Sequence, residues 1–278
     1  MTPSHFALVT GSTDGVGRVV AVRLASRNMH VFVHGRDRPR GDEVANEIRA
    51  AGGSAEFLEA DLASLANVER LADEVQRRTG SLRLLINNAG IGTGGTSARR
   101  QESADGIELR LAVNYLAGYL LTMRLLPLLE KDTPSRIVNV SSIGQAPIDF
   151  QDPLLERSYN GAQAYMQSKL AQVMFTIDLA RTLEGAGVTV NSLHPATYMN
   201  TTMVRQAGVT PMSTVEEGAN AILNLAESPE LEQVSGRFFN GLREARAQEQ
   251  AYDAAARQRL HTLTTDWIRK YQRQRERA

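Results

Sequence analysis

Tyr165 and Lys169 are the residues whose types and spacing most directly suggest chemistry in this chain. They lie four positions apart in a segment expected to be helical, so both side chains would project from one helix face. An ammonium beside a phenol stabilises the phenolate and lowers the pKa of the tyrosine. With seven tyrosines and three lysines in 278 residues, about 0.08 such pairs are expected by chance. The pair is a candidate proton donor, and the alternative is a surface tyrosine beside a solvated lysine.

A glycine-rich turn near the N-terminus is the second candidate. Residues 10–17 read Thr-Gly-Ser-Thr-Asp-Gly-Val-Gly, after the apolar run 6–9 and before a helical pattern. Glycines allow a sharp turn and a close approach to a pyrophosphate, and helix N-terminal N–H groups favour its negative charge. The spacing differs from the Gly-x-Gly-x-x-Gly fingerprint, and a structural turn would also explain it. The candidate nucleotide contacts are Gly11, Thr13, Asp14, Gly15, Val16 and Gly17.

The elements that must position these residues alternate along the chain. Strands are predicted at 6–10, 30–34, 54–58, 82–86, 136–141, 188–193 and 235–240, and helices at 15–28, 39–51, 64–79, 105–130, 160–185 and 214–227. This order predicts a single α/β domain with a doubly wound, Rossmann-like parallel sheet, spanning residues 1–241. Such sheets bind ligands at the carboxyl ends of their strands, where the glycine turn, residues 87–90, Ser142 and residues 194–195 would lie.

Together these segments resemble the short-chain dehydrogenase/reductase family. The resemblance rests also on Asn-Asn-Ala-Gly at 87–90, on Asn114, and on the tandem serines 141 and 142 after an apolar strand, and it covers nearly the whole chain. Residues 104–108, 158–160 and 167–171 resemble the retinol dehydrogenase-like branch in particular. The resemblance implies an NAD(P)-dependent oxidoreductase, without fixing its substrate.

The resemblance implies roles for four catalytic candidates. Tyr165 would be the general acid in carbonyl reduction and the base in the reverse direction. Lys169 would lower its pKa and bind the nicotinamide ribose. Ser142 would hydrogen-bond the substrate oxygen, with Ser141 as the weaker candidate, although either could merely satisfy loop backbone. Asn114 would support a water relay to the lysine, or else bond helix backbone.

Further cofactor contacts are carried over from the family pattern. They are Asn88, Ala89 and Gly90 after the fourth strand, Asp61 and Leu62 after the third, Tyr165 and Lys169 themselves, and Pro195 and Thr197 after the sixth. Asp61 would contact the adenine, and its alternative role is to cap the helix that begins near Ser64.

Cofactor choice depends on the end of the second strand. Gly35 stands where NAD-preferring relatives carry an acidic residue, and Arg36 follows it. Arginine can bind a 2′-phosphate through charge-assisted hydrogen bonds, so NADP(H) is favoured over NAD(H). A solvated Arg36, or Asp37 as the ribose ligand, are the alternatives, and the latter would favour NAD(H).

Two departures from the family pattern concern the substrate side. Ala196 follows Pro195 where glycine is usual, so that loop should differ near the nicotinamide. Twenty-three positions separate Ser142 from Tyr165, and the inserted residues 146–163 should line the substrate mouth together with 197–213. The candidate apolar wall consists of Met199, Met203, Val204, Val209 and Met212, each of which could equally be packing residues.

Composition narrows the partners and the location. Thirty-one basic and 31 acidic residues cancel, so no nucleic-acid partner is expected. With no cysteine, disulfides and thiolate chemistry are excluded, and the five histidines show no ligand spacing for a metal site. No signal peptide and no apolar stretch near the ~18 residues of a membrane span were found, which predicts a cytoplasmic protein.

The last segment, residues 242–278, is expected to be a helical extension of the same domain with a basic end. It would dock on its own domain or on another subunit of a homo-oligomer, and a membrane contact is the minor alternative.

The sequence therefore predicts an NADP-dependent oxidoreductase that interconverts a carbonyl and an alcohol on a fairly apolar small molecule. Two alternatives stay open: a redox-neutral family member such as an epimerase, dehydratase or ring-opening enzyme, and a nucleotide-sensing protein without catalysis.

Overall fold

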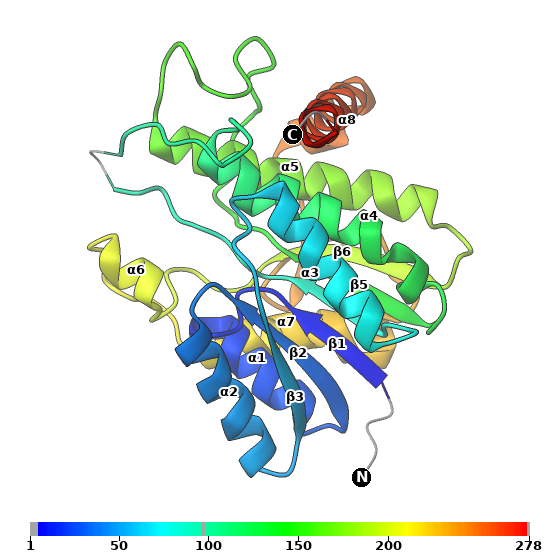
Figure 1. Ribbon diagram of the computed structural model, residues 1–278. Helices are drawn as coiled ribbons and strands as arrows, with labels where there is room; N and C mark the ends of the chain where they lie inside the picture. Colours follow the sequence, from blue (N-terminus) through cyan, green and yellow to red (C-terminus); the bar gives the residue numbers. More distant parts are fainter. Residues whose placement is uncertain (1–4, 96–97, 277–278) are drawn as a thin grey trace.

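One eight-stranded sheet forms the centre of the molecule (Figure 1). The computed structural model describes residues 5–95 and 98–276. The strands are β1 (His5–Val9), β2 (Met29–Gly35), β3 (Ser54–Glu59), β4 (Leu84–Asn87), β5 (Ser135–Val140), β6 (Val188–His194), β7 (Phe238–Asn240) and β8 (Arg243–Ala245), in the order β3-β2-β1-β4-β5-β6-β7-β8. Neighbours pair in parallel except β7 and β8. The predicted doubly wound α/β fold is confirmed.

Helices cover both faces of the sheet (Figure 1). They are α1 (Gly15–Ala25), α2 (Arg38–Ala50), α3 (Leu65–Arg78), α4 (Ala117–Leu129), α5 (Gly161–Thr182), α6 (Thr202–Gln206), α7 (Val215–Glu227) and α8 (Ala254–Arg275). Helices α1, α2 and α7 pack on one face and share one apolar core. Helices α3, α4 and α5 cover the other face, with α8 outside α5, around a second core. Because strands between two helical layers are buried on both sides, they read as continuous apolar runs.

Polar caps fix where the two helices that carry candidate site residues begin. Asp14 accepts the N–H of Gly15 at 2.7 Å and starts α1 directly after the glycine turn. Asn160 accepts the N–H groups of Ala162 and Gln163 at 2.9 and 3.1 Å and starts α5. Such caps satisfy amides that have no partner inside the helix. Tyr165 therefore falls in the first turns of α5, at the end of the helix nearest the strand termini.

The helix predicted over 105–130 begins later than expected. Gly106 has a φ of +74°, and residues 104–107 form a turn. Asp105 is not helical, and its carboxylate instead accepts the N–H of Leu65, 40 positions earlier, at the start of α3. The segment Leu111–Leu116 is π-helical and leads into α4. The prediction failed here because a contact with α3, distant in sequence, competes with local helix propensity.

The C-terminal segment is also less helical than predicted. It begins with β8 and a 3₁₀ turn (Glu249–Tyr252) before α8 starts at Ala254. Helix α8 docks on its own domain: the hydroxyls of Tyr115 and Thr264 lie 2.8 Å apart, and Arg257 pairs with Asp178 at 2.6 Å. The domain predicted over residues 1–241 and the extension predicted over 242–278 have outer ends, residues 1–4 and 277–278, that lie outside the described residues.

One helical stretch, residues Leu111–Leu129, is long and apolar enough to cross a membrane by length and composition alone. The expectation that no apolar stretch approaches that length was therefore wrong. Sixty-one per cent of this stretch is buried within the protein, where α4 packs against α3. It is the central helix of one face of the sheet, and long buried helices of this kind are apolar because they lie in a core.

Candidate active site

The glycine turn after β1 is held by the neighbouring strand. His34, at the end of β2, accepts the N–H of Gly11 at its Nδ1 (3.1 Å), and its Nε2 lies 3.2 Å from the carbonyl of Ala60. Burial lowers the pKa of His34 to about 4, so the ring is neutral and donates from Nε2. Gly11 has a φ of +62°, which favours glycine. The turn is thus rigidly placed at the start of α1.

Free backbone donors lie at the N-terminus of α1. Asp14 caps Gly15, while the amides of Val16 and Gly17 have no acceptor among the described residues. Unpaired N–H groups at a helix N-terminus attract a phosphate. The predicted turn therefore has a donor set that fits a pyrophosphate.

The Asn-Asn-Ala-Gly segment lies against this turn. The amide of Asn88 donates to the carbonyls of Thr10 (2.8 Å) and Gly11 (2.9 Å), and the Thr10 hydroxyl accepts the N–H groups of Asn88 and Ala89, both at 3.0 Å. Asn87 points elsewhere, to buried side chains of α4 and β5. The structure therefore brings together predicted residues from the ends of β1 and β4.

Asn114 fixes the next part of the same loop. Its side-chain oxygen accepts the N–H of Ile91 at 2.8 Å, and its amide donates to the Ile91 carbonyl (3.1 Å) and to Ser168 (2.9 Å). A Cβ on Gly90 would lie 3.2 Å from the Asn114 oxygen and 3.4 Å from Nζ of Lys169. Asn114 lies in the π-helical segment, and π-turns are frequent at functional sites. It thus joins the loop after β4 to α5, beside the candidate lysine.

Lys169 is deeply buried. Its Nζ donates to the carbonyl of Val140 at 2.9 Å and to Oε1 of Gln172 at 3.1 Å. Burial lowers its pKa to about 7. Nζ lies 5.8 Å from the centre of the Tyr165 ring. The ammonium is therefore near the phenol but makes its hydrogen bonds to other groups.

Tyr165 and Ser142 meet at the end of β5. Burial raises the pKa of Tyr165, and a hydrogen bond with Ser142 acts in the opposite direction. The lowering of this pKa expected from Lys169 is not found, because burial is the largest influence on the phenol and raises its pKa. Ser141 donates to the Lys169 carbonyl at 2.7 Å and so has a structural partner. Ser142 is the serine that faces the phenol.

At the end of β2, Arg36 and Asp37, which were expected to determine the preference between NADP(H) and NAD(H), have different partners. Arg36 lies 3.8 Å from Asp61, and both side chains are largely exposed. Asp37 caps α2 by accepting the N–H of Arg40 at 3.1 Å. A Cβ on Gly35 would lie 2.8 Å from the Thr13 hydroxyl, so no acidic side chain fits there without displacing Thr13.

Asp61 and Leu62 have clear structural surroundings. Asp61 accepts the N–H of Ala63 at 3.0 Å, whereas the cap of α3 is Ser64, which makes no side-chain cap bond. The alternative in which Asp61 caps that helix is therefore wrong. Leu62 is buried in the apolar core beneath α3.

The loop after β6 departs from ordinary backbone two residues after Ala196. Tyr198 has a φ of +47°, which is strained for a residue other than glycine. Pro195 is buried, and the Thr197 hydroxyl lies 3.1 Å from Nε2 of His194. The absence of glycine at 196 thus coincides with strain at Tyr198.

Large apolar side chains are exposed around this site. They are Ile143, Tyr198, Met203 and Met212. Ile143 follows Ser142, and Met203 packs close to Gly92 in the loop after β4. Val204 and Val209 are half-buried beside them. Met199 is partly buried and packs against the core under α1 and α7, which is the packing role given above as its alternative.

Sequence reasoning missed His34 and Gln172. Gln172 lies three positions after Lys169 on the same helix face, and that spacing was a usable signal. His34 is a polar residue at the end of an otherwise apolar strand, which also marks it as unusual.

Comparison with known proteins identifies the family. The family model described as short chain dehydrogenase matches residues 5–211. The chain belongs to the short-chain dehydrogenase family. It is an NAD(P)-dependent oxidoreductase by this membership, as the sequence predicted.

Similar proteins support this assignment. Human retinol dehydrogenase 14 is 37% identical over 92% of this chain and 84% of its own length. Mouse polyprenol dehydrogenase is 38% identical over 93% of this chain and 82% of its own length. A short chain dehydrogenase from Burkholderia cenocepacia, solved in complex with NADP, is 27% identical with a TM-score of 0.70, covering 86% of this chain and 96% of its own.

Proposed function

We propose that this protein interconverts a carbonyl and an alcohol on a fairly apolar small molecule, using NADP(H), with Tyr165 as the general acid and base. The observation that carries the proposal is the convergence of Ser142, Tyr165 and Lys169 at the carboxyl end of β5. A phenol hydrogen-bonded to a serine hydroxyl, with an amine nearby, is a suitable donor to a carbonyl oxygen.

The residues of the chain fit a dinucleotide. Val16 and Gly17 offer free amides for the pyrophosphate, and the remaining predicted contacts of the glycine turn and of residues 88–90 surround them. When bound, the dinucleotide supplies or accepts a hydride. Ser142 would hold the substrate oxygen, Tyr165 would exchange a proton with it, and Lys169 would hold a proton nearby.

The preference for NADP(H) is supported by the end of β2. Arg36 is exposed and its contact with Asp61 is a long surface ion pair, which is worth little and leaves the guanidinium available for a 2′-phosphate. Asp37 is engaged as a helix cap, which argues against it as a ribose ligand. The similar Burkholderia protein was solved with NADP.

The apolar character of the substrate is supported by exposed apolar side chains beside Ser142 and in the loop after β6. Ile143, the residue after Ser142, is 56% exposed, and Met212, whose N–H donates to the carbonyl of Tyr198, is 72% exposed. Exposed apolar groups of this kind suit an apolar ligand. The alcohols in the names of the two similar enzymes, retinol and polyprenol, are of this kind.

Mass spectrometry of co-purifying ligand, followed by NADPH oxidation assays on ketones, aldehydes and quinones, tests the proposal. Tyr165→Phe should abolish turnover and leave NADPH affinity largely intact, because only the proton donor is removed. Tyr119→Phe is the matched control, since this tyrosine packs on Phe175 away from the site. Full activity of Tyr165→Phe would refute the acid role. Product formed without NADPH oxidation would indicate redox-neutral chemistry, and tight binding without any turnover would indicate a nucleotide sensor.

A further inference from the structure

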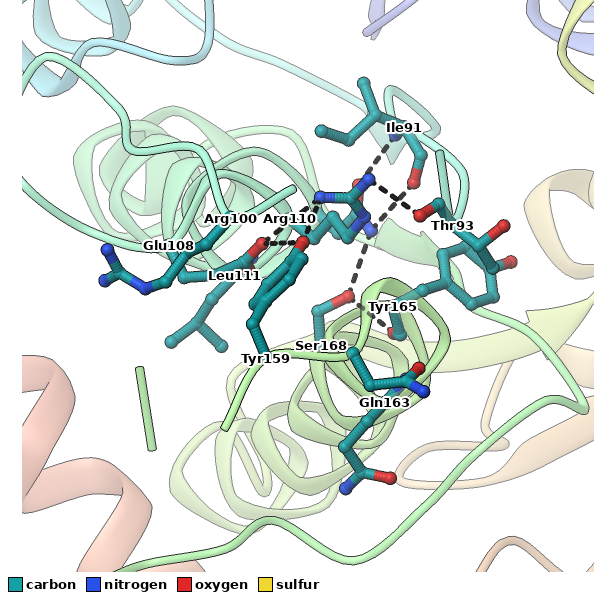
Figure 2. Close-up of polar contacts among 12 residues, drawn as sticks. Ile91, Thr93, Arg100, Glu108, Arg110, Leu111, Tyr159, Gln163, Tyr165 and Ser168 are labelled. Atoms are coloured by element: carbon teal, nitrogen blue, oxygen red, sulfur yellow. Dashed lines mark hydrogen bonds and ion pairs between the residues drawn. The ribbon is translucent and has the colours of Figure 1, made fainter. Parts of the chain in front are cut away.

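Glu108 and Arg110, which are buried, and the half-buried Tyr159 form a polar cluster beside the candidate site (Figure 2). Arg110 donates to the Tyr159 hydroxyl at 2.5 Å and lies 3.4 Å from Glu108. Tyr159 in turn donates to Glu108 at 3.2 Å. Glu108 also accepts the N–H of Leu111 at 2.8 Å. Removing two charges from water is costly, so each member of such a cluster needs these partners to stay buried.

The other donors of Arg110 hold the loop after β4. Its Nε donates to the carbonyl of Gly92 at 2.9 Å, and a terminal nitrogen donates to the carbonyl of Thr93 at 2.7 Å. Asn114, one helical turn further on, holds both the N–H and the carbonyl of Ile91. Two side chains from one helical segment therefore bind three consecutive residues of this loop.

The cluster also touches the start of α5. Tyr159 directly precedes the α5 cap, Asn160. A Cβ on Gly161, the first residue of α5, would lie only 2.3 Å from the carbonyl of Thr93, so the loop and the helix are in direct contact. Arg110 thus lies between the loop, whose Gly90 end approaches Lys169, and the helix that carries Tyr165.

We infer that Arg110, oriented by Glu108 and Tyr159, is a positioning residue for the reaction. Its guanidinium fixes residues 90–93 against the start of α5, and so fixes the nicotinamide side of the site relative to Tyr165. The inference rests on the proposed function for the identity of the nucleotide. Arg110 touches neither the substrate nor the proton in transfer; it acts through the loop backbone that it binds.

Arg110→Lys is the decisive variant, because it keeps the positive charge beside Glu108 but loses the planar fork that reaches two carbonyls. Misplacement of a reacting group by about 1 Å costs about a hundredfold in rate. We expect kcat to fall about ten- to a hundredfold and the Kd for NADPH to rise several-fold. Affinity for 2′,5′-ADP, which lacks the nicotinamide half, should not change.

Arg136→Lys is the matched control. Arg136 is also buried and donates to two backbone carbonyls, those of Leu225 and Ser228, at 3.1 and 2.8 Å. It lies near the start of β5, at the opposite end from Ser142. The Arg136→Lys variant should have a lower melting temperature without a selective loss of NADPH binding or of kcat.

Three outcomes would overturn the inference. Arg110→Lys could weaken the affinities for NADPH and for 2′,5′-ADP equally, or leave both affinities at their wild-type values. The third outcome is the same kcat in Arg110→Lys and Arg136→Lys. Should Arg110→Lys fail to fold, Tyr159→Phe decides, because it removes one partner of Arg110 and no charge. Tyr159→Phe should show the same loss of kcat and of NADPH affinity, with unchanged affinity for 2′,5′-ADP, to a smaller degree. If this selective loss is absent, the result counts against the inference. If the wild-type protein binds NADPH but reduces no carbonyl, the proposed function fails, while the two binding measurements still decide the role of Arg110.

Discussion

Replacing Lys169 with methionine should remove a pH dependence of stability that burial creates. Lys169 is 5% exposed, and burial lowers its pKa from 10.5 to about 7. Between these two values the unfolded chain holds a proton that the folded protein has released, so the free energy of unfolding rises with pH. One proton is worth about 1.4 kcal/mol per pH unit, which gives a gain of roughly 2 kcal/mol from pH 7 to pH 9.

Urea denaturation of the nucleotide-free protein at pH 7, 8 and 9 measures this gain. The unfolding free energy of the wild type minus that of Lys169→Met should increase by roughly 2 kcal/mol over that range. The hydrogen bonds to Val140 and Gln172 that the variant loses shift this difference by the same amount at every pH and do not change its trend. Lys131→Met, at an exposed lysine, is the control and should show no such trend. A constant difference at all three pH values would mean that the folded protein does not depress the pKa of Lys169. Loss of turnover in Lys169→Met is expected in addition, by two to four orders of magnitude if the lysine supports proton transfer.

Two other predictions concern the nucleotide side of the site. Arg36→Ala should lower the preference for NADPH over NADH, measured as the ratio of kcat/KM values, by about ten- to a hundredfold. Arg38→Ala, which removes a partner of Glu59, is the control and should leave this ratio unchanged. An unchanged ratio in Arg36→Ala would reject Arg36 as a phosphate ligand. Burial lowers the pKa of His34 from 6.5 to about 4. As the pH falls from 6.5 to 4, the unfolded chain therefore takes up a proton before the folded protein does, and the free energy of unfolding decreases by about 1.4 kcal/mol per pH unit. His34→Gln should flatten this acid sensitivity in urea titrations at pH 6.5 and 4.5, and an equal slope in both proteins would contradict the neutral, buried state.

The sequence was sufficient for the parallel sheet because its strands lie between two helical layers and are therefore apolar throughout. Leu8 and Phe32, for example, are fully buried in neighbouring strands. Once the alternation of strands and helices was recognised, the carboxyl ends had to meet at one edge of the sheet. That geometry explains why the contact between Asn88 and the turn at Gly11 could be anticipated without a structure.

Contacts between segments with no shared periodicity could not be anticipated. One partner of Arg110 is the carbonyl of Gly92, 18 positions away in an irregular loop, and a carbonyl carries no sequence signal. Asp105 lies in a pattern that suits a helix, yet it is not helical, and its carboxylate accepts the N–H of Leu65 at the start of α3. In both cases a polar group that is buried or partly buried needed a partner, and only the packing of the elements determines which partner it finds.

The buried environment also determines which proton states the site favours. Desolvation opposes ionisation, so it raises the pKa of Tyr165 and lowers that of Lys169. A tyrosine that keeps its proton can act as an acid, whereas a base would need the phenolate and a compensating positive charge close to it. The Lys169 ammonium, held by Val140 and Gln172, supplies that charge only at a distance, and only while it stays protonated. In the proposed reaction, carbonyl reduction starts from the protonated phenol that burial favours, and alcohol oxidation starts from the phenolate that burial disfavours.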